Sequence, residues 1–311
     1  MISVRICSLL PSSTEILFAL GLGDRVVAVT HECDFPPQAA VKPQVTRSEI
    51  NPLLASAEID FRVRQQLENV GSLYQLDAQL LEELKPDIIF TQQLCTVCAV
   101  SYDNVYRIAN SLPSKPRVVN LEPKSLEGIF ENILEVGSLA NVADRAAKRV
   151  NELRQRVEKV RHLTLNTDRR KLLFLEWLEP PFCAGHWVPE LIDFAGGFDP
   201  FGKRHQPSSQ LAWEQILSYN PDVIVVSCCG FSVERALKEI HVLANNEFQH
   251  LTAAREASFF VVDGSSYFSR PGPRIVDSLE ILAAILHPEL FPIDYPQSVV
   301  RRVNILATEY S

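Results

Sequence analysis

The chain has 311 residues, of which 46% are hydrophobic and 22% charged, and its formal net charge at pH 7 is −8. This length is typical of about two domains, and the composition is that of a globular protein with a sizeable core. The negative charge excludes a general nucleic-acid-binding surface, which requires a basic face.

The first part of the chain, residues 1–123, is predicted to be one α/β lobe. Apolar strands are expected at Val4–Leu10, Arg25–Thr30, Asp87–Thr91 and Arg117–Leu121, and helices at Ile16–Leu20, over most of Glu58–Leu84 and at Tyr102–Leu112. Alternating strands and helices with apolar strands indicate a parallel sheet covered on both faces. Ser12, Ser13 or Thr14 is expected to cap the first helix.

Residues 124–165 are predicted to form a long helix that connects two lobes. A break is expected between Asn141 and Asp144. After it, apolar residues recur every three or four positions from Ala147 to Leu163 among charged ones, which is the pattern of an amphipathic helix.

Residues 166–290 are predicted to be a second α/β lobe. Strands are expected at Lys171–Trp177, Asp222–Ser227 and Phe259–Asp263, and helices at Trp187–Ala195, Leu211–Tyr219, Val233–Lys238 and Ile275–Leu286. The tail, residues 291–311, is expected to be a packing extension or a frayed end.

Two distant segments support the division into similar lobes. Leu81–Phe90 and Trp213–Val225 each contain the end of a helix, a Pro-Asp corner and an apolar strand, and each strand runs into a polar loop that contains cysteine. Ligands of parallel sheets bind beyond the carboxyl ends of the strands. The predicted fold is therefore two Rossmann-like lobes with mainly parallel sheets, joined by one long helix, with a ligand held between them.

The location of the protein is predicted from its first residues and its cysteines. The segment Met1–Leu10 is too short for a membrane span and lacks the features of a secretory signal. Seven cysteines, some adjacent, suit a reducing compartment. We predict a cytoplasmic protein without membrane insertion. A periplasmic or extracellular location is the alternative if a signal has been removed.

Several motifs resemble one known family. Leu10–Gly21 with Asp24–Thr30, the Lys-Pro-Asp-Ile-Ile block at 85–89 and the segment Pro189–Gly197 resemble the cobalamin-binding periplasmic proteins. These belong to the helix-linked class (class III) of substrate-binding proteins, which also carries siderophores, haem and metal ions. The resemblance covers residues 3–290. It implies reversible binding of a corrinoid such as cobalamin, with an ABC permease as partner only if the protein is exported.

A second hypothesis is a metal-ion-binding protein or metallochaperone. His31, Cys33, Cys95 and Cys98 follow two predicted strands of the first lobe, and three thiolates with an imidazole are a sufficient set for Zn²⁺ or another thiolate-bound metal. The alternatives for these residues are small buried cysteines, direct contact with the ligand, or redox chemistry.

In the second lobe, His186 and Trp187 lie between a strand and a helix. Trp187 offers a flat face for stacking against a macrocycle, or else packs in the core. His186 could approach a central metal or the ligand amides, or else be structural. Gly185 would let the backbone approach the ligand.

The loop Ser269-Arg-Pro-Gly-Pro-Arg274 is the most distinctive of the second lobe. Its prolines restrict the backbone, Gly272 permits an unusual conformation, and Arg270 and Arg274 carry fixed charges. It either presents guanidinium groups to a ligand or is a rigid turn whose arginines pair with acidic neighbours.

These considerations give one set of residues expected to contact the ligand. The set is Ser12, Ser13, Thr14, His31, Gln92, Gln93, Cys95, His186, Trp187, Ser269, Arg270, Gly272 and Arg274. No P-loop, dinucleotide fingerprint, HExxH helix or GxSxG elbow is found, so no catalytic residue is predicted. An enzyme of thiol or corrinoid chemistry, using Cys95 and Cys98, is the third hypothesis.

Overall fold

The computed structural model describes residues 4–70, 73–93, 100–243 and 247–305. The chain divides into two compact units. Unit 1 combines the chain up to Leu54 with Glu58–Pro123 and Glu127–Asn151. Unit 2 combines Ala55–Ala57, Lys124–Leu126 and the chain from Glu152 onward. Helix α7 (Ala143–Thr164) therefore contributes residues to both units. None of the described helices is both long and apolar enough to span a membrane.

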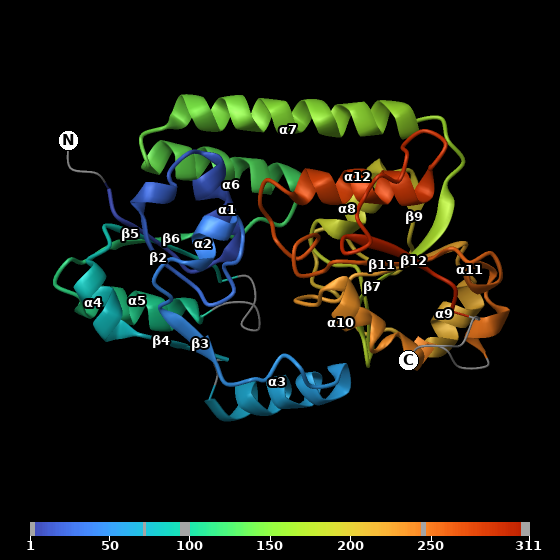
Figure 1. Ribbon diagram of the computed structural model, residues 1–311, viewed down its shortest axis with the longest axis horizontal. Helices are drawn as coiled ribbons and strands as arrows, with labels where there is room; N and C mark the ends of the chain where they lie inside the picture. The colour runs from blue at the N-terminus through green and yellow to red at the C-terminus, as the bar shows by residue number, and fades with distance from the viewer. Residues whose placement is uncertain (1–3, 71–72, 94–99, 244–246, 306–311) are drawn as a thin grey trace. The chain divides into compact units, whose positions relative to one another are not determined.

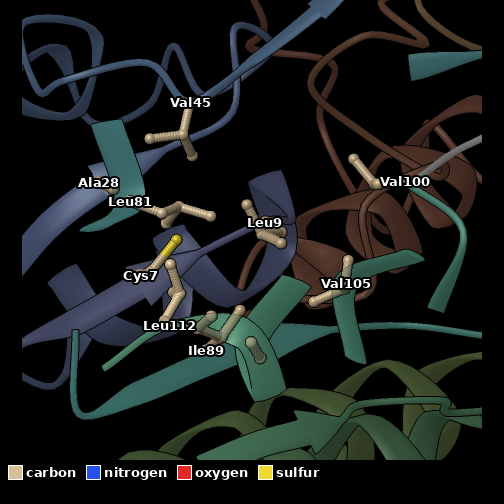
Figure 2. Packing of buried hydrophobic residues seen from close by; sticks show 10 residues of the cluster. Cys7, Leu9, Ala28, Val45, Leu81, Ile89, Val100, Val105 and Leu112 are labelled. Atoms are coloured by element: carbon tan, nitrogen blue, oxygen red, sulfur yellow. The ribbon is translucent and has the colours of Figure 1, made fainter. Parts of the chain in front are cut away.

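Unit 1 is built on a four-stranded sheet in the order β2-β1-β5-β6, with all neighbours parallel. Its strands are β1 (Ile6–Ser8), β2 (Val26–Val29), β5 (Ile88–Thr91) and β6 (Arg117–Asn120). The central strands β1 and β5 are buried along their whole length, as expected for a sheet covered on both faces. Figure 2 shows Cys7 and Ile89 from these strands packed with Leu81, Val105 and other apolar side chains. The predicted parallel arrangement is confirmed.

The helices of unit 1 correct two expectations. They are α1 (Pro11–Ala19), α2 (Pro37–Ala40), α3 (Ser56–Val70), α4 (Ala78–Leu84) and α5 (Tyr102–Ser111), with a 3-10 turn η1 at Gly23–Arg25. Helix α1 begins at Pro11, and no side chain caps its first turn. The expected cap at Ser12, Ser13 or Thr14 is wrong, because proline is already well suited to the first helical position.

The second correction concerns residues expected to be helical up to Leu84. The strand β4 (Tyr74–Leu76) lies within them and pairs antiparallel with β3 (Thr46–Ser48). Across the pair, the Arg47 Nε donates a hydrogen bond to the Gln75 amide oxygen at 2.7 Å. Such a pairing joins residues far apart in the sequence, so the local helical periodicity does not indicate it.

The connecting region consists of two helices, as the expected break requires. Helix α6 (Leu126–Leu139) is followed by α7, and Asn141 between them has φ 57°. The two helices run side by side (Figure 1), and Gly137 allows their close approach, because a Cβ there would lie 2.3 Å from the Ala146 Cβ. The chain reverses here through a left-handed residue rather than through a bend in one helix.

Unit 2 contains a mixed sheet in the order β12-β11-β10-β7-β8, and β9 pairs with β7. Its strands are β7 (Arg170–Leu178), β8 (Pro181–Cys183), β9 (Gly197–Phe198), β10 (Val223–Val226), β11 (Phe259–Val262) and β12 (Val300–Val303). The pairs β7–β10, β10–β11 and β7–β9 are parallel, whereas β8 and β12 run antiparallel to their neighbours. Within the described residues of the predicted tail, β12 pairs with β11 and ends the sheet.

The helices of unit 2 agree closely with the expected ones. They are α8 (Val188–Phe194), α9 (Trp213–Tyr219), α10 (Val233–Leu237), α11 (Thr252–Arg255) and α12 (Ile275–Leu286), with 3-10 turns η2 (Ile240–Leu243) and η3 (Phe248–His250). Helix α12 is almost entirely buried, which agrees with its apolar sequence.

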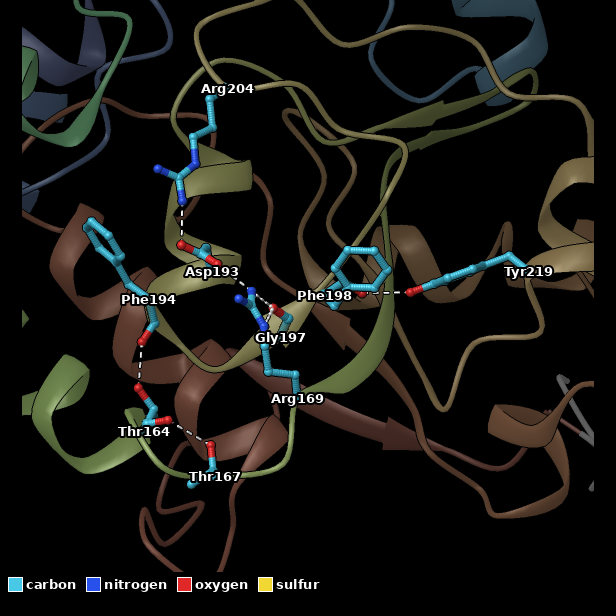
Figure 3. Close-up of polar contacts among 9 residues, drawn as sticks. All are labelled: Thr164, Thr167, Arg169, Asp193, Phe194, Gly197, Phe198, Arg204 and Tyr219. Carbon is cyan, nitrogen blue, oxygen red and sulfur yellow. Dashed lines mark hydrogen bonds and ion pairs between the residues drawn. The ribbon is translucent and has the colours of Figure 1, made fainter.

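Side chains from neighbouring segments form hydrogen bonds to the backbone of the short strand β9 (Figure 3). The Arg169 guanidinium donates to the Gly197 carbonyl and pairs with the Asp193 carboxylate, which also binds Arg204. The Tyr219 hydroxyl donates to the Phe198 carbonyl at 2.6 Å. These side-chain contacts compensate for the few ladder hydrogen bonds that a two-residue strand can make.

The two half-matching segments have the same local structure. In each, a helix ends at a residue with positive φ, Lys85 (44°) in one and Asn220 (47°) in the other. The aspartate of the following Pro-Asp corner then accepts a hydrogen bond from the backbone N–H at the start of the neighbouring strand. Asp87 accepts from Arg5 at 2.7 Å, and Asp222 accepts from Lys171 at 3.0 Å.

Replacing Asp222 with alanine is expected to lower the free energy of unfolding by about 1–2 kcal/mol, because the partly buried Lys171 N–H loses its acceptor. Asp87→Ala is expected to act in the same direction with a smaller loss, since that contact is exposed. Urea denaturation followed by circular dichroism measures both. Asp168→Ala in an exposed loop is the control, and a loss in Asp222→Ala no larger than in this control would contradict the role of the corner.

Candidate functional site

In unit 2, two loops follow the carboxyl ends of the parallel strands β10 and β11, a third follows the antiparallel strand β8, and the three hold one another in place. The N–H groups of Gly264 and Ser265, after β11, donate to the carbonyl of Phe231, after β10, at 2.9 and 3.1 Å. The Trp187 indole N–H, which follows β8, donates to the carbonyl of Phe268 at 2.7 Å. We call residues 184–187, 227–231 and 264–274 the loop cluster. The two loops after β10 and β11 lie at the edge of the sheet at which ligands of α/β folds bind.

Two glycines allow the backbones of the loop cluster to pack closely. A Cβ on Gly264 would lie 2.1 Å from the carbonyl oxygen of Cys228, and a Cβ on Gly185 would lie 2.3 Å from the backbone nitrogen of Ser208. Gly185 was expected to let a ligand approach the backbone. The structure shows that its missing side chain makes room for the chain at Ser208 instead.

Glu176 is a functional candidate that sequence reasoning missed. It is partly buried near the end of β7 and accepts a hydrogen bond from the Gly185 N–H at 2.9 Å. Burial raises the pKa of this carboxyl to about 7, against the opposing effect of its hydrogen bonds from Gly185 and Ser208. The available signal was a lone acidic residue within an otherwise apolar strand.

Trp187 lies inside unit 2. The residue is only 5% exposed, and its ring lies 5.5 Å from that of His186 at an interplanar angle of 29°. Of the two alternatives that the sequence left open, the structure places this tryptophan in the core position rather than on a free surface. The nearby Trp177, which was not among the expected residues, packs against Phe231 with ring centroids 5.0 Å apart.

His186 is half-buried and has φ 53°, so it occupies a backbone conformation that is uncommon for a side-chain-bearing residue. Burial lowers its pKa, and the positive charge of Lys124 acts in the same direction. Both effects favour the neutral imidazole over the charged one. Its Nδ1 is buried without a hydrogen-bond partner among the described residues.

The loop with two arginines and two prolines is well packed. Arg270 is 8% exposed and contacts the Ser265 hydroxyl at 3.5 Å, and the Ser269 hydroxyl donates to the Gly264 carbonyl at 2.6 Å. Arg274 lies over the ring of Tyr267, 5.4 Å from its centroid. The unusual backbone conformation expected at Gly272 occurs at Phe268 instead, which has φ 60°.

In unit 1, the predicted hydroxyl residues bind one another. Ser13 and Ser8 are joined at 2.6 Å, and Thr14 donates to Ser8 at 2.8 Å. The Cys33 thiol lies 3.1 Å from the Thr14 hydroxyl and 3.2 Å from that of Thr30. All of these residues are buried, as is Ser12. Their polar atoms stabilise the end of β1 and the start of α1.

The remaining residues predicted in unit 1 lie near the ends of β2 and β5. His31 is partly buried, its Nδ1 is 2.8 Å from the Thr46 hydroxyl, and its ring lies 5.5 Å from that of Tyr74. Gln92 is buried, whereas Gln93 is exposed and its backbone N–H donates to Asn120 at 2.9 Å.

The expected metal set receives no support from the described residues. Cys95 and Cys98 lie outside them, His31 bonds to Thr46, and Cys33 lies among hydroxyls. Within residues 4–70, 73–93, 100–243 and 247–305, no group of three or more His, Cys, Asp or Glu side chains is placed to hold a metal ion.

Comparisons with known proteins extend over most of the chain. The model of a family described as "Periplasmic binding protein" matches residues 6–265. The vitamin B12-binding protein of Vibrio cholerae is 25% identical over 285 residues, which are 91% of this chain and 88% of that protein. The ABC transporter substrate-binding lipoprotein YvrC of Bacillus subtilis is 22% identical over 298 residues, 92% of this chain and 81% of the other.

A solved structure supports the fold independently. A periplasmic heme-binding protein from Pseudomonas aeruginosa superposes with a TM-score of 0.72 at 19% identity, covering 95% of this chain and 96% of that one. The resemblance and the two-lobed helix-linked fold expected from the sequence are confirmed.

The predicted cytoplasmic location is wrong. The matching family is one of periplasmic binding proteins, the relative from B. subtilis is a lipoprotein, and the structural neighbour from P. aeruginosa is periplasmic. The cysteine pattern misled the prediction, because buried thiols such as Cys7, Cys183 and Cys228 are packing residues in this fold.

Proposed function

The chain belongs to the periplasmic binding protein family, and from this membership we propose that it binds a corrinoid of the cobalamin type and delivers it to an ABC permease. The proposal is carried by the similarity to the vitamin B12-binding protein of V. cholerae, which extends over 91% of this chain. Substrate-binding proteins of ABC transporters bind their ligands without transforming them, so the protein is not an enzyme.

Unpartnered polar atoms in the loop cluster, and on Trp177 that packs against it, support this part of unit 2 as a place of contact. The Ser227 hydroxyl, the Trp177 indole N–H and the His186 Nδ1 are buried and lack hydrogen-bond partners in the described part of the chain. Buried polar groups in native proteins nearly always have partners. A corrinoid ring carries many amide groups at its edge, and these can donate to and accept from such atoms.

Charge and polarity suggest further contacts. In unit 2 we propose His186, Ser269, Arg270, Gly272 and Arg274 as residues of the binding surface. In unit 1 we propose His31 and the exposed Gln93, whereas the hydroxyls of Ser13 and Thr14 are engaged with Ser8. A mainly apolar surface with a few polar anchors is typical of small-molecule sites.

Titration with cyanocobalamin is expected to give saturable binding with a Kd of about 1 μM or lower, corresponding to about −8 kcal/mol. Isothermal titration calorimetry measures the affinity, and quenching of tryptophan fluorescence provides an independent signal. Cobinamide tests whether the nucleotide part of the ligand matters. Haemin tests the alternative cargo of the structural neighbour.

The variant Arg270→Gln is expected to weaken cyanocobalamin binding about tenfold, because a cation that contacts the ligand is removed. Arg204→Gln is the control for the loss of a guanidinium elsewhere in unit 2, since Arg204 is an exposed arginine that pairs with Asp193. Equal affinities of the two variants for cyanocobalamin would show that Arg270 does not contact the ligand. Binding of haemin with no response to cyanocobalamin at millimolar concentration would contradict the corrinoid proposal.

A further inference from the structure

Phe268 occupies an unusual backbone conformation. Its φ of 60° lies in the left-handed region, which bulky residues seldom adopt. The Ser269 N–H donates to the Tyr267 carbonyl at 2.6 Å, so these three residues form a γ-turn. A γ-turn whose central residue has positive φ is the rarer and more strained kind. A turn of this kind persists only where its surroundings hold it in place.

Three contacts hold Phe268 in this turn. The Trp187 indole N–H donates to its carbonyl at 2.7 Å, and its own N–H donates to the Ser278 hydroxyl at 3.1 Å. Its ring packs against Phe174 of β7, with centroids 4.9 Å apart. The contacts to Phe174 and Ser278 come from the core of unit 2. The contact to Trp187 comes from another loop of the loop cluster.

The turn sets the direction of the residues that follow it. Ser269 turns back to donate to the Gly264 carbonyl, and Arg270 reaches the Ser265 hydroxyl. A second tight turn follows at once, because the Gly272 N–H donates to the Arg270 carbonyl at 2.8 Å. The position of the Arg270 side chain therefore depends on the backbone at Phe268.

We propose that Trp187 is a positioning residue, whose indole N–H fixes the Phe268 carbonyl and thereby sets the placement of Ser269 and Arg270 for the ligand. The inference rests on the proposed function for the identity of the ligand. The part that concerns Trp187 and the Phe268 carbonyl does not depend on that function. The role proposed for Trp187 differs from stacking against a macrocycle. Stacking requires an exposed ring face, and this residue is only 5% exposed.

The variant Trp187→Phe keeps an aromatic ring at this position but removes the N–H donor together with part of the buried indole ring. Hydrogen–deuterium exchange of the backbone amides in residues 265–274 is expected to become about tenfold faster, while the strands β7, β10 and β11 remain as protected as in the unaltered protein. Trp213→Phe is the matched control, because Trp213 packs edge-on against Phe248 in the same unit. Unchanged exchange in 265–274, or equal acceleration throughout unit 2, would overturn the proposal.

A double-mutant cycle with cyanocobalamin tests the link to Arg270. Trp187→Phe alone is expected to weaken binding about tenfold, but less than about twofold when Arg270→Gln is already present. Equal losses in both backgrounds would mean that Trp187 does not act through Arg270. If the unaltered protein binds no cyanocobalamin, the proposed function fails, and the exchange measurement still decides whether Trp187 holds the loop.

Discussion

Replacing Gly264 with alanine is expected to destabilise the protein by about 3 kcal/mol. The new Cβ would lie 2.1 Å from the carbonyl oxygen of Cys228 and 2.7 Å from its carbonyl carbon. Both are backbone atoms, so no side-chain rotation relieves the clash. The loop must shift and lose the hydrogen bonds from Gly264 and Ser265 to Phe231.

Gly230→Ala in the same loop cluster provides the control. Gly230 has φ 77°, but nothing lies within 4 Å of a Cβ placed there. This variant is expected to lose only about 1–2 kcal/mol, the cost of a left-handed conformation in a residue with a Cβ. Urea denaturation measures both losses. A Gly264→Ala protein at least as stable as Gly230→Ala would show that the close packing of the two loops is unimportant.

Glu176 is expected to make stability depend on pH near neutrality. Burial raises the pKa of its carboxyl from 4.5 to about 7 in the folded protein. Below pH about 4.5 the carboxyl is protonated in both states, and it has no effect on the free energy of unfolding. As the pH rises through about 7, the folded state must hold an unfavourable charge. Stability therefore falls between these pH values, by up to about 3 kcal/mol for a shift of this size.

Glu176→Gln is expected to remove this decline, because the amide has a similar shape and does not ionise. Asp199, whose pKa is raised by burial to about 6, contributes a decline of the same sign, so the difference between the two proteins is the relevant quantity. Urea denaturation at several pH values between 4 and 8 provides it. Glu179→Gln at an exposed position serves as the control. Parallel pH profiles of Glu176→Gln and the unaltered protein would refute the assignment.

Much of the fold was predictable because its signals are local. The apolar strands and the Pro-Asp corners identify β5 and β10 directly, and Asp87 and Asp222 make equivalent contacts in the two units. The short strands β3, β4, β8, β9 and β12 were not predicted. The strands β3, β4, β9 and β12 pair with partners distant in the sequence, whereas β8 forms a hairpin with β7.

The candidate site was predictable only in part. Residue type alone pointed to Trp187 and to the loop with Arg270, and both lie in the loop cluster. The contacts that each side chain makes could not be predicted in this way. Spacing could not show that Cys33 lies among hydroxyls, that Gly185 makes room for Ser208, or that Phe268 rather than Gly272 has the unusual backbone. These facts depend on which segments meet in space.

The last described strand has a consequence for how the protein can be handled. Strand β12 covers the outer side of β11, whose four residues Phe259–Val262 are all apolar and buried. The Arg301 and Arg302 side chains on β12 are exposed, and Arg302 also donates to the carbonyls of Glu256 and Ala257. Charged residues on an outermost strand discourage association with other sheets. A chain shortened before Val300 would expose the unpaired edge of β11, which could then associate with other protein molecules. Affinity tags should therefore be added after β12 and should not replace it.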